Sequence, residues 1–142
     1  MFLGRTQHSI DTKGRWIVPS KLRADLGGLF YVTFGFDGCL YVYPRAEWEK
    51  MAEKTQAIPT SDKEGRKFLR SFFGEAMEAA PDGQWRILIS ERLREYAKID
   101  KEVYLIGVGS KLELWSKEVY DSAADLEVVG DDILSKMADL GI

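Results

Sequence analysis

Short apolar runs alternate with turn residues along the first half of this chain. Residues 15–18, with the sequence Arg-Trp-Ile-Val, predict a strand that follows an Asp-Thr-Lys-Gly turn, because Gly14 can adopt a positive φ at little cost. Pro19 suits the first turn of a helix, and the pattern of residues 20–26 predicts a short helix that ends at Gly27. The pattern therefore predicts strand, turn, strand and helix in that order.

Two β-rich runs follow, at residues 29–34 and 39–44, and the Gly-Phe-Asp-Gly segment between them predicts a hairpin before a helix begins at Arg45. The same order of features then returns further along the chain. A shift of 71 residues places Asp11, Arg15, Leu22 and Arg23 on Asp82, Arg86, Leu93 and Arg94, and a shift of 72 places residues 35–48 on 107–120. Internal duplication of a ββα unit is therefore the leading interpretation.

Two more helices are predicted around the second repeat. Apolar side chains at helical spacing predict a connecting helix packed through its aromatic side, with Phe68, Leu69, Phe72, Phe73 and Met77. Near the C-terminus, two acidic residues favour a helix start and four apolar residues form one stripe: Asp131, Asp132, Ile133, Leu134, Met137 and Leu140. The chain thus divides into a first repeat (1–54), a connecting helix (55–78), a second repeat (79–122) and an acidic helical tail (123–142).

Composition is that of a soluble globular protein, with 142 residues of which 45% are hydrophobic and 30% charged. No apolar run approaches the roughly 18 residues that span a membrane, and the N-terminus lacks the apolar core of a secretory signal. The single cysteine, Cys39, excludes an intrachain disulfide. These features predict a cytoplasmic protein without a membrane partner.

Charge is distributed unevenly, although the net charge is only −3. Residues 1–23 carry five Lys or Arg against one Asp, whereas residues 118–142 carry seven acidic residues against one Lys. An uneven solvated surface is one explanation of this pattern. A basic surface that binds nucleic acid is the other.

Four stretches together resemble the MraZ family of bacterial transcriptional regulators, which have tandem SpoVT-AbrB-like repeats. They are residues 1–23, 37–49, 68–73 and 93–115, so the resemblance extends from Met1 to about Tyr120. It implies an α+β fold: a pseudo-twofold, swapped-hairpin β-barrel built from two AbrB-like ββα repeats, with peripheral helices. One ββα unit is too small to bury its own hydrophobic face, and two units supply the missing face to each other.

The resemblance also implies a function. Members of the family bind direct repeats in the promoter of the division and cell-wall gene cluster, and they assemble into rings. A sequence-specific regulator of this kind has double-stranded DNA and further copies of itself as partners, and it is cytoplasmic and nucleoid-associated. The operator sequence, the sign of regulation and the ring size stay open.

The second repeat departs from the family pattern at its turn. Trp85 stands where a glycine is expected before Arg86, and a Trp in left-handed geometry costs roughly 1–2 kcal/mol. We therefore expect Gly83 to supply the positive φ instead. Ser90 replaces the usual proline, but Ser is a good N-cap, so a helix is still expected after it.

DNA binding requires cations that reach phosphates and a few groups that reach base edges, and arginine binds guanine bidentately. The candidates are Arg5, His8, Lys13, Arg15, Lys21, Arg23, Arg86, Arg92 and Arg94, with Asp11, Gly14 and Asp82 orienting the arginines or shaping the turns. Acidic neighbours dilute the second set, so the first repeat is expected to be the stronger DNA face. The alternative for Arg15 and Arg86 is an ion pair that only holds the turn, and the alternative for His8 is an ordinary polar strand residue.

Other functions have weaker support. His8 and Cys39 could in principle form a nucleophilic pair, but no helper acid, phosphate-binding glycine loop or metal-ligand spacing accompanies them. We therefore expect no enzyme activity, catalytic residue, metal, cofactor or small-molecule substrate. Two alternatives stay open: an antitoxin-like module of the AbrB fold, and a structural ring protein that does not bind DNA.

Overall fold

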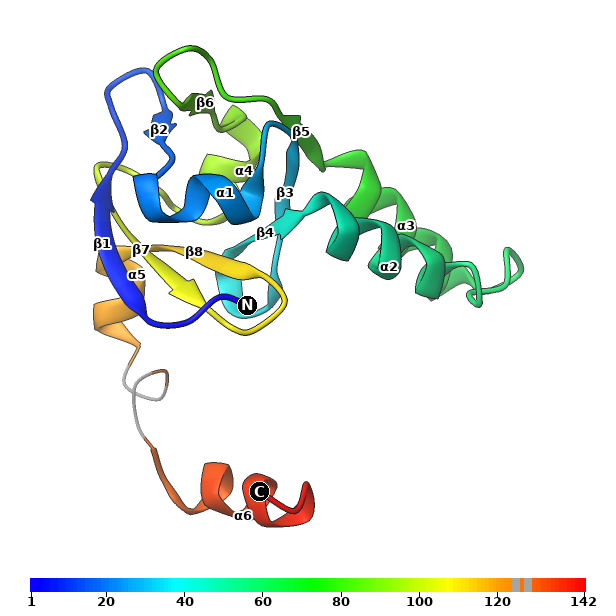
Figure 1. The fold of residues 1–142 in the computed structure, drawn as a ribbon. Coiled ribbons are helices and arrows are strands. Elements are labelled where there is room, and N and C mark those ends of the chain that lie inside the picture. The colour runs from blue at the N-terminus through cyan, green and yellow to red at the C-terminus, as the bar shows by residue number, and fades with distance from the viewer. Residues whose placement is uncertain (124–125, 127–128) are drawn as a thin grey trace.

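The computed structural model describes all residues except 124–125 and 127–128, as an α+β protein with two similar halves (Figure 1). The first half contains β1 (Arg5–Ser9), β2 (Arg15–Ile17), η1 (Ser20–Leu22), α1 (Arg23–Leu26), β3 (Phe30–Phe34), η2 (Phe36–Gly38), β4 (Leu40–Pro44) and α2 (Arg45–Thr55). After α3 (Lys63–Gly74), the second half contains β5 (Met77–Ala79), β6 (Arg86–Leu88), α4 (Glu91–Tyr96), β7 (Glu102–Gly107), β8 (Leu112–Ser116) and α5 (Lys117–Ser122). The helix α6 (Asp131–Asp139) follows.

The strands of the two halves are interleaved. The order in the larger sheet is β1-β7-β8-β4-β3-β5, and β2 and β6 form a separate two-stranded ribbon. The first strand of each half therefore pairs with the third strand of the other half, as β1 with β7 and β5 with β3. Each half completes the sheet of the other, which explains why one small chain contains the unit twice.

The pairing register shows a pseudo-twofold relation. Trp16 pairs with Ile87, and Tyr41 pairs with Glu113. The members of each pair are also the residues that the duplication relates, by shifts of 71 and 72 along the sequence. A position that pairs with its own duplicate lies on a twofold axis, so this axis passes through both the ribbon and the β4–β8 pair.

The expected closed barrel is not present, because the larger sheet is open. Its end strands are β1 and β5, and these do not pair with each other among the described residues. One isolated bridge, between Ile10 and Trp16, connects the end of β1 to the ribbon. The ribbon has only three residues in each strand, and its inner side chains pack onto the sheet instead of extending it.

The core lies between the ribbon and the larger sheet. Trp16 is fully buried and meets Phe30 of β3 edge to face, with ring centroids 6.4 Å apart. Ile87 of β6, Val103 of β7 and Leu114 of β8 belong to the same buried cluster. Because the inner face of the ribbon is anchored in this way, its outer face is held in a fixed orientation.

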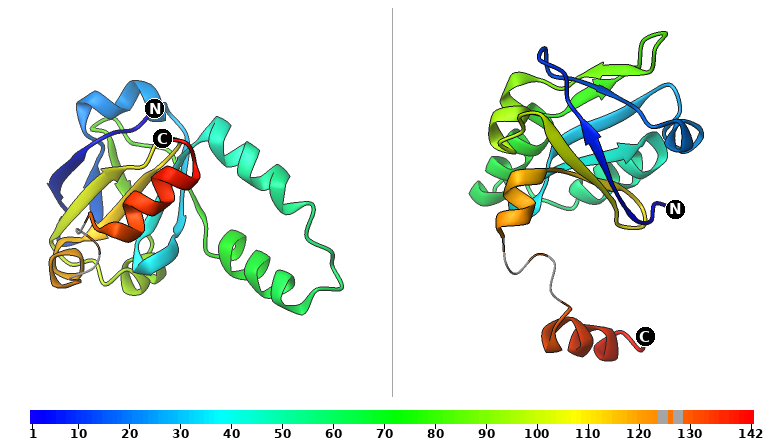
Figure 2. Two further views of the ribbon diagram at one scale, coloured as in Figure 1. Left: turned by 90° about the horizontal axis from the view of Figure 1, so that it is seen from below. Right: turned by 90° about the vertical axis from the view of Figure 1, so that its left-hand side faces the viewer.

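The helices α2 and α3 extend from the body as a hairpin (Figures 1 and 2). Phe72 of α3 stacks on Trp48 of α2 with ring centroids 5.8 Å apart, and Phe68 stacks on Phe72. The structure thus confirms a connecting helix that packs through its aromatic side. The assignment of Met77 to this helix is wrong, because α3 ends at Gly74 and Met77 pairs with Val32 in the sheet.

The last helix, α6, begins at Asp131 as expected, and it lies apart from the sheet (Figure 2). The stripe of apolar side chains along it is exposed, with Ile133, Leu134, Met137 and Leu140 between 39% and 63% accessible. None of the described helices combines the length and apolar character that crossing a membrane requires.

Candidate nucleic-acid interface

One carboxylate closes the turn between β1 and β2. Asp11 Oδ1 accepts hydrogen bonds from the backbone N–H groups of Lys13 and Arg15, both at 2.9 Å. Its Oδ2 accepts from the Nε–H of Arg15 at 2.6 Å. The backbone N–H of Gly14 donates to the Asp11 carbonyl at 3.0 Å. The turn and the Arg15 side chain are therefore fixed by the same carboxylate.

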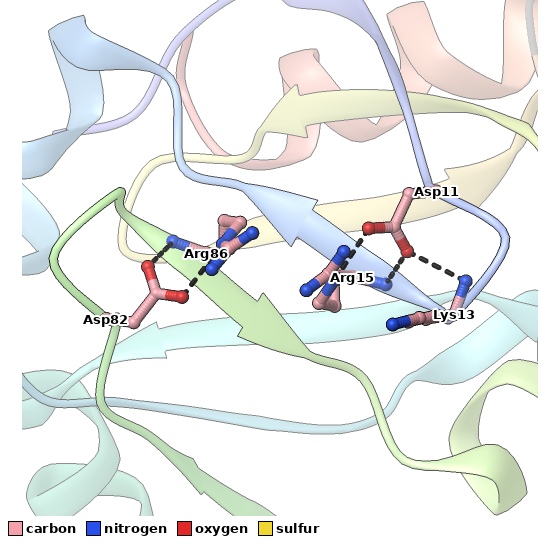
Figure 3. A network of polar contacts seen from close by, with 5 residues as sticks. All are labelled: Asp11, Lys13, Arg15, Asp82 and Arg86. Carbon is pink, nitrogen blue, oxygen red and sulfur yellow. Dashed lines mark hydrogen bonds and ion pairs between the residues drawn. The ribbon is translucent and has the colours of Figure 1, made fainter.

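The turn before β6 repeats this network. Asp82 Oδ1 accepts from the backbone N–H groups of Gln84 and Arg86 at 2.8 and 3.0 Å, and its Oδ2 accepts from the Nε–H of Arg86 at 2.8 Å. Figure 3 shows the two networks near each other on the ribbon. The ion pair that holds the turn, the alternative considered for both arginines, is thus present in both repeats.

The ion pairs do not use the whole guanidinium group. Within the described part of the chain, the side-chain hydrogen bonds and ion pairs of Arg15 and Arg86 use Nε and leave the two Nη atoms to other ligands. These side chains are 33% and 30% exposed. A guanidinium that is oriented by a carboxylate and accessible at its Nη edge has the geometry for a bidentate contact.

Hydrogen bonding keeps both carboxyl groups ionised. The backbone N–H of Arg15 lowers the pKa of Asp11, and the Arg15 side chain and the Lys13 N–H add to this effect. The pKa of Asp82 is lowered by the corresponding N–H of Arg86, again with help from its side chain. Both ion pairs therefore persist at neutral pH.

The outer surface of the ribbon brings the two arginines together. Arg15 pairs with Leu88 and Ile17 pairs with Arg86, so the arginines lie diagonally across the two strands. These four outward side chains are called the ribbon face below. Ile17 and Leu88 are 55% and 56% exposed, and sequence reasoning missed them as site residues. The period-two alternation of a strand could have identified them, because it places Ile17 on the side of Arg15, opposite to buried Trp16.

Trp85, and not Gly83, supplies the positive φ of the second turn. Its φ is 61°, whereas φ is 85° at the equivalent Gly14. Trp85 donates its N–H to the Asp82 carbonyl at 2.9 Å and accepts from the N–H of Val18 at 2.8 Å. Moving the positive φ to Gly83 would misalign both groups, so the expectation of a shifted turn is wrong.

Two helix arginines pack against the turns, each on the turn of the other repeat. Arg23 Nε–H donates to the Val18 carbonyl at 3.0 Å, and its guanidinium lies 5.0 Å from the centre of the Trp85 ring. Arg94 Nε–H donates to the Ile89 carbonyl at 2.9 Å. Its guanidinium occupies the space beside Gly14 that a Cβ there would enter. Both arginines are thus held beside the ribbon by the pseudo-twofold arrangement.

His8 and Lys21 are near each other on the flank of this region. His8 Nε2 lies 2.7 Å from Thr6 Oγ1, and both side chains are partly buried on β1. Burial lowers the pKa of His8, and the positive charge of Lys21 lowers it further. His8 is therefore neutral at pH 7 and can contact a phosphate only as a hydrogen-bond donor.

Arg5 and Arg92 lie elsewhere. The Arg5 guanidinium is 4.9 Å from the centre of the Tyr104 ring and 5.4 Å from that of Tyr120, so it lies beside α5. Arg92 forms an ion pair with Glu75 at 3.0 Å, near the end of α3. The structure does not bring these two residues to the ribbon face.

The geometry at Cys39 does not favour nucleophilic chemistry. The thiol is fully buried, and its Sγ lies 3.3 Å from the Phe36 carbonyl. Burial raises the pKa of the thiol, so it stays protonated at neutral pH. No group of three or more metal-ligating side chains occurs within the part of the chain that is described.

Known proteins resemble the whole chain. The model of a family described as "MraZ protein, putative antitoxin-like" matches residues 1–71 and again residues 72–126. A protein of Clostridium beijerinckii named "Transcriptional regulator MraZ" is 46% identical over 142 residues, which is all of both chains. Proteins with the same name from Acetivibrio thermocellus and Carboxydothermus hydrogenoformans are 46% and 42% identical, over 100% and 98% of each chain. Two matches of the family model and full-length identity at this level establish that the chain belongs to the MraZ family.

Proposed function

We propose that this chain is a transcriptional regulator that binds DNA through the ribbon face. The observation that carries the proposal is the pair of arginines, Arg15 and Arg86, each oriented by an aspartate on the exposed side of a two-stranded ribbon. The major groove of B-DNA admits such a ribbon, and arginine bound to guanine is the commonest specific contact. The names of the relatives support the same function.

Other cations would position the duplex. Lys13 lies in the first turn, and Arg23 and Arg94 lie against the two turns. We assign these three to phosphate contacts around the ribbon face, with Lys21 and His8 on the flank. A DNA role for Arg5 or Arg92 requires a duplex that continues past the ribbon, over α5 or over the start of α4.

The finer proposal is a ring that binds direct repeats in the promoter of the division and cell-wall gene cluster, in a cytoplasmic, nucleoid-associated protein. One ribbon contacts only a few base pairs, and a genome offers about 10⁶–10⁹ competing sites. Several identical subunits on several repeats gain selectivity by effective concentration. Head-to-tail assembly suits direct repeats, whereas a twofold dimer would suit a palindrome. The exposed stripe of α6 is available for subunit contacts.

Two experiments test the proposal. The duplex directly upstream of the gene for this chain is titrated with the protein at several salt concentrations, against a shuffled duplex of equal length. We expect preferential binding that weakens linearly on a log–log plot of affinity against salt. Light scattering should show a closed assembly larger than a dimer. Equal affinity for both duplexes would exclude sequence-specific regulation, and a monomer that still binds tandem repeats tightly would exclude the ring.

The antitoxin-like alternative is kept because the family description contains that word. In this alternative, the exposed apolar stripe of α6 would contact a second protein. A protein whose mass and operator affinity are unchanged when α6 is removed, and which co-purifies with a partner only when α6 is present, would favour it. A structural ring would show no salt-sensitive binding to either duplex.

A further inference from the structure

Two exposed apolar side chains lie within the most polar part of the ribbon. Ile17 and Leu88 are duplicates of each other under the shift of 71 residues, and both are more than half exposed. Scattered exposed apolar residues are ordinary, but these two alternate with the arginines on a face of four side chains. Such a face presents two hydrogen-bond donors and two aliphatic groups in a fixed square.

We propose that Ile17 and Leu88 contact the methyl groups of thymines in the major groove, next to the guanines that Arg15 and Arg86 bind. The inference rests on the proposed function of the ribbon face and extends it, because it assigns specificity to residues outside the Asp–Arg pairs. Thymine differs from the other bases in the major groove by its C5-methyl group, and apolar side chains are the groups that recognise it.

The register of the ribbon sets the spacing of these contacts. Side chains directly opposite in a strand pair have Cβ atoms about 4.5–5.5 Å apart, and diagonal neighbours are about 7–8 Å apart. The two arginines are diagonal neighbours, so their separation matches about two base steps of roughly 3.4 Å. Each arginine has an apolar side chain directly opposite, Leu88 for Arg15 and Ile17 for Arg86. A thymine methyl one step from each guanine lies within reach of that partner.

Charge favours DNA over a protein as the occupant of this face. The segments 11–17 and 82–88 carry three cations against two carboxylates, and the arginines packed on the turns raise the balance to five against two. The net charge of the chain is −3, so this region is basic in an acidic protein. An apolar protein contact here would bury two ion pairs, and the desolvation of such pairs offsets what the two aliphatic groups contribute.

The test removes the methyl groups from the DNA. The upstream duplex is prepared with dT and, separately, with dU in place of every dT, which keeps the Watson–Crick hydrogen bonds and deletes the C5-methyl groups. Both duplexes are titrated with the parent protein, with the Ile17→Ala/Leu88→Ala variant and with a control, Val108→Ala, whose side chain is exposed away from the ribbon. A buried methyl contact contributes about three- to fourfold in affinity, so the parent should prefer the dT duplex by roughly tenfold.

The variant should bind both duplexes equally, while the control keeps the preference. A variant that retains the full preference for dT would overturn the inference, since a general effect of dU on DNA shape then explains it. An altered assembly mass of the variant would overturn it in favour of a subunit contact. The Ile17→Thr/Leu88→Thr variant keeps the β-propensity of the strands and must give the same result. Failure of the proposed function is distinct, because the parent would then fail to prefer the upstream duplex over the shuffled one.

Discussion

The two turns of this protein have nearly the same backbone and hydrogen bonds, yet they differ in two of their five residues. The first turn has the sequence Asp-Thr-Lys-Gly-Arg, and the second has Asp-Gly-Gln-Trp-Arg. Each aspartate accepts the same three hydrogen bonds, with donor–acceptor distances that differ by at most 0.2 Å between the turns. The network therefore needs only the Asp and the Arg, and the other positions are available for different tasks.

The differences are concentrated in charge and size. The first turn carries Lys13 and the compact Gly14, whereas the second carries neutral Gln84 and the bulky Trp85. The first turn can approach a phosphate with an extra cation and no side chain at the left-handed position. The second turn uses its ring to support Arg23 at 5.0 Å. We infer that the first turn contributes more to DNA affinity and the second more to the rigidity of the ribbon.

The largest expected effect is on operator binding by the arginine variants. We expect Arg15→Ala to abolish specific binding while fold and assembly stay intact, because one bidentate contact is worth about 1–3 kcal/mol per site and a ring engages several sites. Arg86→Ala should also weaken binding, but less. Titration of the upstream duplex gives the affinities, and circular dichroism checks the fold. Equal affinity of Arg15→Ala and the parent would limit Arg15 to a structural role, and a larger loss for Arg86→Ala would reverse the comparison.

Exchanging the charges of the two turns should give a smaller effect on affinity. Lys13→Gln should weaken binding to all sequences alike and reduce the salt slope by about one per subunit on the DNA, because it removes a phosphate contact. Gln84→Lys should increase both quantities if the second turn also faces the duplex. The slopes are measured between low and physiological salt. An unchanged slope in Lys13→Gln would show that the first turn does not reach the backbone.

Much of this site follows from the sequence because its determinants are local. The strands around the turns, the Asp–Arg spacing and the duplication all involve residues within a few positions of each other, so turn and strand preferences suffice to predict them. The helix after Ser90 was also predictable, and the Ser90 hydroxyl does accept from the N–H of Leu93 at 3.4 Å. Local preference failed at Trp85, where a ladder bond from Val18 fixes the backbone against the steric preference of the side chain.

The rest of the site depends on contacts between distant segments. Basic character alone could not show that Arg5 packs on Tyr104 or that Arg92 pairs with Glu75, since both partners are remote in sequence. The open sheet was equally hidden, because three-residue strands can either extend a sheet or cross over it. The short pattern of alternation in β2 and β6 did contain the ribbon face, but an exposed Ile or Leu has no functional signal without its surroundings.

A moderate effect on stability is expected for Trp85→Gly. Glycine relieves roughly 1–2 kcal/mol of left-handed strain, but the variant loses the packing of a half-buried ring and a cation–π contact of about 0.5–1 kcal/mol. We expect a net loss of about 1 kcal/mol, which lowers Tm by roughly 2–8 °C. In the Trp85→Gly background, Arg23→Ala should cost less than in the parent, while Arg94→Ala should cost the same in both. A rise in Tm would show that strain outweighs the support of Arg23.

The smallest expected effect is the acid dependence of the two turns. The folded-state pKa values of Asp11 and Asp82 are both lowered, chiefly by the backbone N–H groups of Arg15 and Arg86. A group with a lowered folded-state pKa stabilises the protein above its unfolded pKa of about 3.9, and this stabilisation is lost as the pH falls through the folded value. We therefore expect Tm to decrease below about pH 4, by similar amounts for the two turns. Asp11→Asn and Asp82→Asn keep an oxygen that can accept the backbone N–H groups but cannot titrate, so each should flatten part of this decrease in melting curves recorded between about pH 2 and 6. Unequal flattening would show that the second turn, despite its matching distances, does not stabilise the fold as the first one does.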